Sequence, residues 1–82
     1  MKKTHQDHNR NLIGKRVREA RLKTKPVVSQ DALAGKLAGK GIILDQTAIS
    51  RIEKQQRYVM DYEAAAIAKC LRVSVAWLYG DE

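Results

Sequence analysis

The chain has 82 residues, enough for one domain with one core and too few for a large active-site cleft. Its 16 Lys and Arg against 9 Asp and Glu give a net charge of +7, which suits a polyanionic partner. No apolar run approaches the roughly 18 residues that a membrane span needs, and the first residues lack the apolar stretch of a secretory signal. We therefore expect a cytoplasmic protein that makes no membrane contact.

The positive charge is concentrated at the beginning of the chain. Residues 1–28 hold nine Lys or Arg against two acidic residues, whereas residues 29–82 hold seven of each sign and are neutral. The first third is thus expected to supply most of the attraction to a polyanion. The alternative, that these cations only form a solvated helix face, stays open.

Residues 1–10 are polar and show no helical period, which predicts a flexible basic arm ahead of a domain over residues 11–82. The arm contains His5, Asp7 and His8, two imidazoles and a carboxylate that could ligate a metal. Because no further ligand cluster exists elsewhere, we expect neither a metal nor another cofactor. The arm either follows a phosphate backbone, enters a minor groove or has no function of its own.

A first helix is predicted over about residues 12–23, with Leu12, Ile13, Val17 and Ala20 as its apolar stripe, and Pro26 prevents its continuation. A second helix is predicted over about residues 29–38. Its N-cap is Ser29, and Gly39-Lys40-Gly41 follows its end; its apolar side holds Leu33, Ala34 and Leu37.

A third helix is predicted over about residues 46–54, capped by Asp45 and buried through Ile49 and Ile52. Its other side carries amide, hydroxyl and guanidinium groups. Glutamine can pair bidentately with adenine and arginine with guanine, so this face favours DNA reading in the major groove. The side chains in question are Gln46, Thr47, Ser50 and Arg51.

Two more helices complete the predicted all-α fold. One covers about residues 61–71, where Cys70 is expected to be a small buried side chain. A short one begins at the cap Ser74 and contains Trp77, which either closes the core over the preceding helix or joins Tyr79 in a dimer contact. Of Ile42 and Ile43 in the loop before the third helix, one is expected to seal the core and one to face outward.

Four segments together resemble the lambda-repressor-like, Cro/CI-type helix-turn-helix regulators: residues 13–21, 29–37, 47–53 and 71–78. The resemblance covers about residues 11–80. It implies a compact five-helix DNA-binding domain whose helix-turn-helix is formed by the second and third helices. The sequence differs from the family pattern at four places. Residues 24–28 form a longer link between the first and second helices than the family has, and Ala32 and Ala48 replace more polar family residues. The second and third helices are joined by residues 38–43 instead of a tight turn, and Gln55 occupies a position where the family commonly has glycine, which favours a different cap.

The resemblance assigns roles to particular residues. Arg21 and Glu53 match an ion pair that fixes the third helix against the first, and Gln30 matches a residue that binds phosphate and braces the reading helix. Base contacts are expected from Gln46, Thr47, Ser50 and Arg51, and phosphate contacts from Gln30, Lys54, Arg57 and Lys40.

The sequence thus predicts a regulator of transcription that binds double-stranded DNA, a repressor acting as a homodimer on a two-fold operator with half-sites about 34 Å apart. We expect no small-molecule ligand, because no separate domain is available for one. Catalysis is not expected either, since neither a glycine-rich phosphate loop nor a pair of catalytic carboxylates is present. The alternative is an antitoxin or another protein-interaction module of the same fold, which binds a toxin or the transcription machinery.

Overall fold

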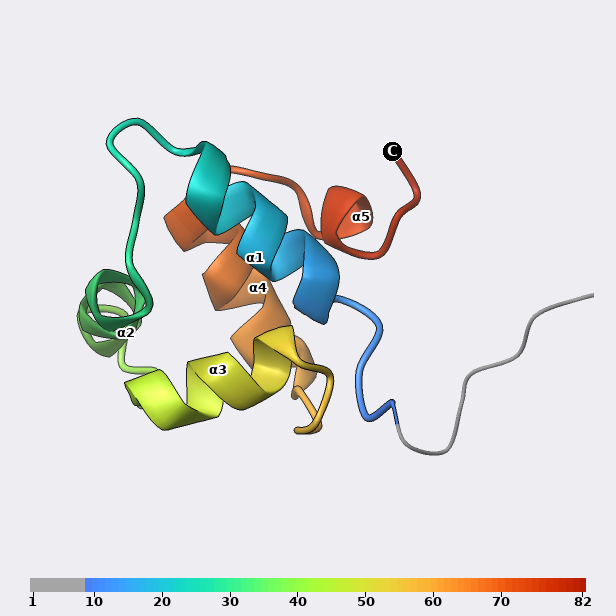
Figure 1. Ribbon diagram of the computed structural model, residues 1–82, viewed down its shortest axis with the longest axis horizontal. Helices are drawn as coiled ribbons and strands as arrows, with labels where there is room; N and C mark the ends of the chain where they lie inside the picture. The colour runs from blue at the N-terminus through green and yellow to red at the C-terminus, as the bar shows by residue number, and fades with distance from the viewer. Residues whose placement is uncertain (1–8) are drawn as a thin grey trace, which may run out of the picture.

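A computed structural model of the chain describes residues 9–82, which form five helices and no strand (Figure 1). The helices are α1 (Gly14–Lys23), α2 (Gln30–Ala38), α3 (Gln46–Glu53), α4 (Asp61–Leu71) and α5 (Val75–Leu78). The all-α class predicted from the sequence is confirmed for these residues. The expectations for a flexible arm and for His5 and His8 fall on residues 1–8, outside the described part of the chain.

A single core holds the helices together. α1 packs against α3, α4 and α5, while α2 packs against α3 and α4. In Figure 1, α3 crosses one edge of the molecule with α2 at its beginning, and α4 lies behind α1. The most deeply buried side chains come from all five helices and the segment before α1; they are Ile13, Val17, Leu33, Leu37, Ile49, Ile52, Ile67 and Leu78.

The start of α1 differs from the sequence prediction. Leu12 was placed on the buried stripe, but it is 61% exposed, and the stripe consists of Ile13, Val17 and Ala20. The reason is Asn11, whose Oδ1 accepts hydrogen bonds from the backbone amides of Ile13 and Gly14 at 3.1 and 2.8 Å. The helix therefore begins after Leu12, and the helical period does not apply to that residue.

The predicted caps of α2 and α3 are present. Ser29 Oγ accepts a hydrogen bond from the Ala32 amide at 3.0 Å, and Asp45 Oδ1 accepts one from the Ala48 amide at 2.8 Å. Between these helices Gly41 has a φ of +81°, a left-handed conformation that favours glycine. This connection sets the chain's path into α3.

The two isoleucines of the α2–α3 connection separate as expected. Ile42 packs against the core, and Ile43 is 81% exposed. Leu44, between Ile43 and the cap of α3, is buried and ties the connection to the core.

α4 and α5 close the other side of the core. Ser74 Oγ caps α5 by accepting a hydrogen bond from the Trp77 amide at 2.9 Å, and Trp77 lies partly buried against the core. The Arg16 guanidinium stacks 4.3 Å from the centre of the Trp77 ring. Cys70 is only partly buried, less than predicted, and this burial raises its thiol pKa despite the opposing charges of Lys40 and Lys36. No helix in the described residues is long and apolar enough to cross a bilayer.

Candidate nucleic-acid interface

One face of α3 presents a continuous set of polar side chains. Gln46, Thr47 and Arg51 are exposed, and Ser50 next to them is partly buried. These four residues line a shallow, open hollow of about 400 Å³, and Gln30, Lys54 and Gln56 complete its lining. Its lining contains amide, hydroxyl and cationic groups and no carboxylate, so it offers hydrogen bonds without repelling an anion.

The opposite face of α3 is buried and determines which side chains point outward. Ile49 and Ile52 are 1% and 0% exposed, and Glu53 at the last turn is 7% exposed. Buried positions at 49, 52 and 53 follow the helical spacing of three and four residues. The same period turns residues 47, 50 and 51 away from the core, and Gln46, the first residue of the helix, is exposed as well.

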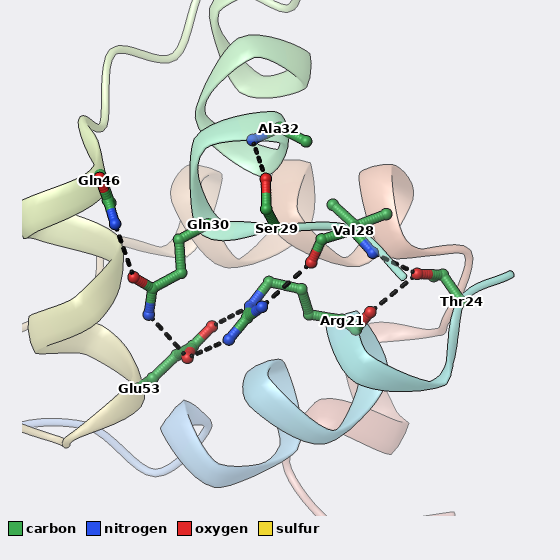
Figure 2. A network of polar contacts seen from close by, with 8 residues as sticks. All are labelled: Arg21, Thr24, Val28, Ser29, Gln30, Ala32, Gln46 and Glu53. Atoms are coloured by element: carbon green, nitrogen blue, oxygen red, sulfur yellow. Dashed lines mark hydrogen bonds and ion pairs between the residues drawn. The ribbon is translucent and has the colours of Figure 1, made fainter. Parts of the chain in front are cut away.

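Arg21 of α1 and Glu53 of α3 form a two-pronged ion pair (Figure 2). Arg21 Nε donates to Glu53 Oε2 at 2.7 Å and Nη2 donates to Oε1 at 2.9 Å. Their side chains are only 9% and 3% exposed. The hydrogen bonds that Arg21 donates to Glu53 raise the pKa of Arg21 against the opposing effect of burial. A third donor, Arg21 Nη1, reaches the carbonyl of Val28 at 3.1 Å and links the pair to the chain before α2.

Gln30 connects this ion pair to the beginning of α3 (Figure 2). Its Nε2 donates to Glu53 Oε1 at 3.1 Å, and its Oε1 accepts a long hydrogen bond of 3.5 Å from Gln46 Nε2. Gln30 therefore contacts α3 at both ends. An amide nitrogen carries two hydrogens, and the second of these in Gln30 has no partner among residues 9–82, which leaves it available to a phosphate oxygen.

The expected phosphate-binding cations do not share one environment. Lys54 is exposed and lines the hollow, and Lys40 is exposed in the α2–α3 connection, away from the hollow's lining. Arg57, in contrast, is engaged within the protein. Its guanidinium binds Glu63 at 3.0 and 3.4 Å and the carbonyl of Tyr58 at 2.8 Å. Arg57 thus holds the segment after α3 on α4, a role that the sequence did not indicate.

The Arg57 contact also affects the acid at the start of α4. Burial of the Glu63 carboxyl acts to raise its pKa, but the hydrogen bond from Arg57, the amide of Met60 and the charge of Arg57 together outweigh burial. The pKa of Glu63 is therefore lowered from its ordinary value of 4.5. Glu63 is ionised at neutral pH and serves both as partner of Arg57 and as cap of α4.

Asn11 joins the beginning of α1 to the end of α3, and sequence reasoning did not assign it this role. It is 8% exposed, and its Nδ2 donates to the carbonyls of Ile52 and Arg57 at 3.1 and 2.8 Å. An asparagine side chain commonly accepts hydrogen bonds from backbone amides two or three residues on, so its contacts with the amides of Ile13 and Gly14 at the start of α1 were predictable. Its contacts with a segment more than 40 residues away were not.

Gly14 permits α1 and α3 to approach closely. A Cβ built on Gly14 would lie 2.1 Å from the carbonyl oxygen of Ile52, so only glycine fits without a shift of the two helices. The sequence held one signal of this close approach, a glycine in the first turn of a predicted helix. Glycine lowers helix stability, so its presence there indicates tight packing.

Gln55 ends α3 in a left-handed conformation with a φ of 61°, although the sequence favoured a different cap. Two hydrogen bonds hold it there. Its Nε2 donates to the carbonyl of Asn11 at 3.0 Å, and its own carbonyl accepts from the Arg10 amide at 2.9 Å. These bonds offset the strain that a non-glycine residue has in this region. They also fix Arg10, which was assigned to the arm, against the end of α3.

Within residues 9–82 no three His, Cys, Asp or Glu side chains lie close enough to hold a metal ion. Comparisons of the chain with protein-family models, with curated proteins and with solved structures returned no match.

Proposed function

We propose that this protein is a sequence-specific regulator that binds double-stranded DNA, with α2 and α3 acting as a helix-turn-helix of the lambda-repressor-like type. The observation that supports this most is the outward face of α3. Four hydrogen-bonding side chains lie side by side on it, and the helix is fixed from behind by a buried ion pair. A rigid helix with such a face has what major-groove reading requires.

The dimensions of α3 match those of the groove. A helix with side chains is about 10–12 Å wide, and the major groove of B-DNA is about 12 Å wide. The eight residues of α3 extend about 12 Å, so the residues of its first two turns can reach neighbouring base pairs. Arg51 suits guanine and Gln46 suits adenine as bidentate partners, while Thr47 and Ser50 can bond to several bases.

Phosphate contacts are assigned to the cations and amides around this face. Lys54 lies beside the base-reading residues, and Gln30 has a free N–H next to the start of α3. Lys40, in the connection before α3, is our third candidate. We assign Arg57 a bracing role instead, because Glu63 occupies its guanidinium. Exposed Lys15 and Arg18 on α1 add to the field that attracts the DNA.

A homodimer on a two-fold operator is part of the proposal. One domain with a short reading helix makes few base contacts, and a second copy supplies the missing affinity. The segment between α3 and α4 and the first turn of α4 expose apolar side chains that such a dimer could cover, namely Tyr58, Met60 and Tyr62 at 64%, 56% and 59% exposure. Analytical ultracentrifugation of the free protein and of its DNA complex tests this part separately.

Selection of bound duplexes from a random pool tests the proposal directly. We expect an enriched motif with two inverted half-sites about one helical turn apart. Failure to enrich any motif would refute sequence-specific DNA binding. A protein that binds no duplex but purifies as a complex with a small partner would support the antitoxin or interaction module instead.

Two single substitutions distinguish base reading from phosphate binding on the selected duplex. Arg51→Ala should lower affinity by about 1–3 kcal/mol and relax preference at one base pair. Lys54→Ala is the matched loss of a neighbouring cation and should weaken binding to all sequences alike. The slope of log affinity against log salt concentration should fall by the amount that one phosphate contact contributes. If Arg51→Ala also weakens all sequences alike, Arg51 contacts phosphate and its assignment as a base-reading residue is wrong.

A further inference from the structure

A groove of about 680 Å³ lies on a part of the surface that α3 does not reach. It is bordered by the α1–α2 connection, by α2 and by the end of α4, with Trp77 of α5 at one side. No residue lines both this groove and the hollow on α3. The groove is therefore a separate surface, and DNA bound on α3 would leave it open.

The floor of the groove is apolar. Leu71 is buried beneath it, while Val28, Val73 and Cys70 are partly buried and reach its surface. Val27, 58% exposed, stands at its edge. Exposed aliphatic side chains gathered around a concavity are a feature of binding sites and are unfavourable if left in water.

The rim of the groove is cationic. Lys23, Lys25, Lys36 and Arg72 line it, and no Asp or Glu does. Lys23 is paired with Glu19 at 2.8 Å. The other three form no ion pair with any residue from 9 to 82, so their charges remain unbalanced there. A segment that fills this groove must provide apolar side chains for the floor and carboxylates for the rim.

Arg72 occupies its place on the rim in a strained conformation. It is the C-cap of α4 with a φ of 59°, in the left-handed region where glycine is the favoured residue. Unlike Gln55, which is held by its side-chain amide, Arg72 shows no side-chain hydrogen bond within the described residues. If Arg72 served only to end α4, a glycine in its place would be more favourable, because glycine adopts a positive φ without strain. The strain is consistent with a use for the guanidinium itself.

We propose that this groove docks a short acidic segment of a partner protein. One or two apolar side chains of that segment lie on Val28, Leu71 and Val73, and its carboxylates face Lys25, Lys36 and Arg72. The apolar floor disfavours a nucleic-acid backbone as the occupant, since phosphates and sugars would leave the valines uncovered without a compensating gain. Charge complementarity thus selects the acidic peptide.

Selection from displayed random dodecapeptides on the immobilised full chain tests this inference. We expect the enriched peptides to combine Asp or Glu with Leu, Ile or Phe. A synthetic peptide of the enriched sequence, labelled for fluorescence anisotropy, should lose binding when its acids are replaced by lysine. Amide shifts in the protein should change at residues 25–28 and 70–73 and not along α3.

Substitutions on the rim separate docking from folding. Arg72→Gly should weaken the peptide about two- to fivefold, the value of one exposed charge pair, while its melting temperature stays equal or rises because the strain is removed. The double charge reversal Lys25→Glu with Arg72→Glu should weaken it more than about tenfold. Lys69→Glu is the matched control, because Lys69 is an exposed cation of α4 outside the groove and its loss should change binding less than about twofold.

Three results would overturn the inference. Enriched peptides without acidic residues, or peptides whose affinity is unchanged in the double reversal, would show that the rim does not select the ligand. Self-association that the groove variants abolish would make the groove an interface between copies of this chain. A DNA duplex that competes with the peptide and loses affinity to the same extent in Arg72→Gly would identify the occupant as nucleic acid.

Discussion

Removing one partner of the Arg21–Glu53 ion pair should be among the most destabilising changes in this protein. In Arg21→Met the alkyl stem is largely kept, but the Glu53 carboxylate stays 97% buried with Gln30 as its one remaining side-chain donor. Breaking a buried pair in this way costs about 3–5 kcal/mol, whereas an exposed pair contributes about 0–1 kcal/mol. Both side chains are buried, so the larger cost applies to this pair.

The loss should be large compared with the stability of the whole domain. A chain of 82 residues typically unfolds with a free energy of about 4–12 kcal/mol, so Arg21→Met should remove about a quarter or more of it. Urea unfolding followed by circular dichroism measures this difference, and the melting temperature should fall by more than about 12 °C.

The double variant Arg21→Met with Glu53→Leu provides the control. Replacing both charges by apolar side chains removes the unpaired carboxylate, so much of the stability should return. A loss below about 1 kcal/mol in Arg21→Met would refute the reasoning, because it would mean that the pair behaves as a solvated one. A double variant no more stable than Arg21→Met would show that the loss arises from packing and not from the buried charge.

Three further predictions concern the junction of α1, α3 and α4. Gly14→Ala should lower the free energy of unfolding by about 1–3 kcal/mol in thermal unfolding, because its Cβ meets the Ile52 carbonyl; an unchanged melting temperature would contradict this close approach. Asn11→Ala should lose at least about 2 kcal/mol, since four hydrogen bonds disappear, and a surface-like loss below about 0.5 kcal/mol would argue against them. The lowered pKa of Glu63 means that its contribution to stability is present above pH 4.5 and is lost as the pH falls through the folded-state pKa. In Glu63→Gln the free energy of unfolding should therefore fall less steeply with decreasing acid pH than in the unsubstituted protein. An unchanged slope would show that the Arg57 contact does not lower the pKa of Glu63.

The helices were predictable because their signals are local. Ser29, Asp45 and Ser74 each cap a helix through an amide within three residues, and such contacts are readable from spacing alone. The buried side of α3 was predictable for the same reason, since its period is carried by a few neighbouring residues. The assignment of its outward face to base contacts remains a prediction.

The features that sequence reasoning missed depend on contacts between distant segments. Asn11 is recognisable as a cap, but its bonds to the end of α3 require knowing which helices pack together. Arg57 was assigned as a phosphate contact, and its ion pair with Glu63, six residues on, was not anticipated. Leu12 fits a helical stripe in a helix that begins two residues later. In each case a tertiary contact overrides a valid local pattern.

The orientation of α3 is set mainly from α1 and much less by the long connection that precedes α3. The Arg21–Glu53 pair, the Gly14 contact and the Asn11 bonds all act on the last turn of α3. Within residues 9–82 its first turn makes one side-chain hydrogen bond to another helix, the 3.5 Å bond between Gln46 and Gln30, besides the packing of Ile49 in the core. A longer connection between α2 and α3 therefore does not require a different position of α3.

Gly41→Ala tests this directly, because a Cβ on Gly41 meets nothing within 4 Å and the substitution introduces only the strain of a positive φ. We expect a loss of about 1–2 kcal/mol in urea unfolding. Amide shifts should change in residues 38–45 but not in residues 49–53, and the base preference of the selected duplex should stay the same. If instead the shifts of residues 49–53 move as far as they do in Arg21→Met, the connection and not α1 sets the position of α3.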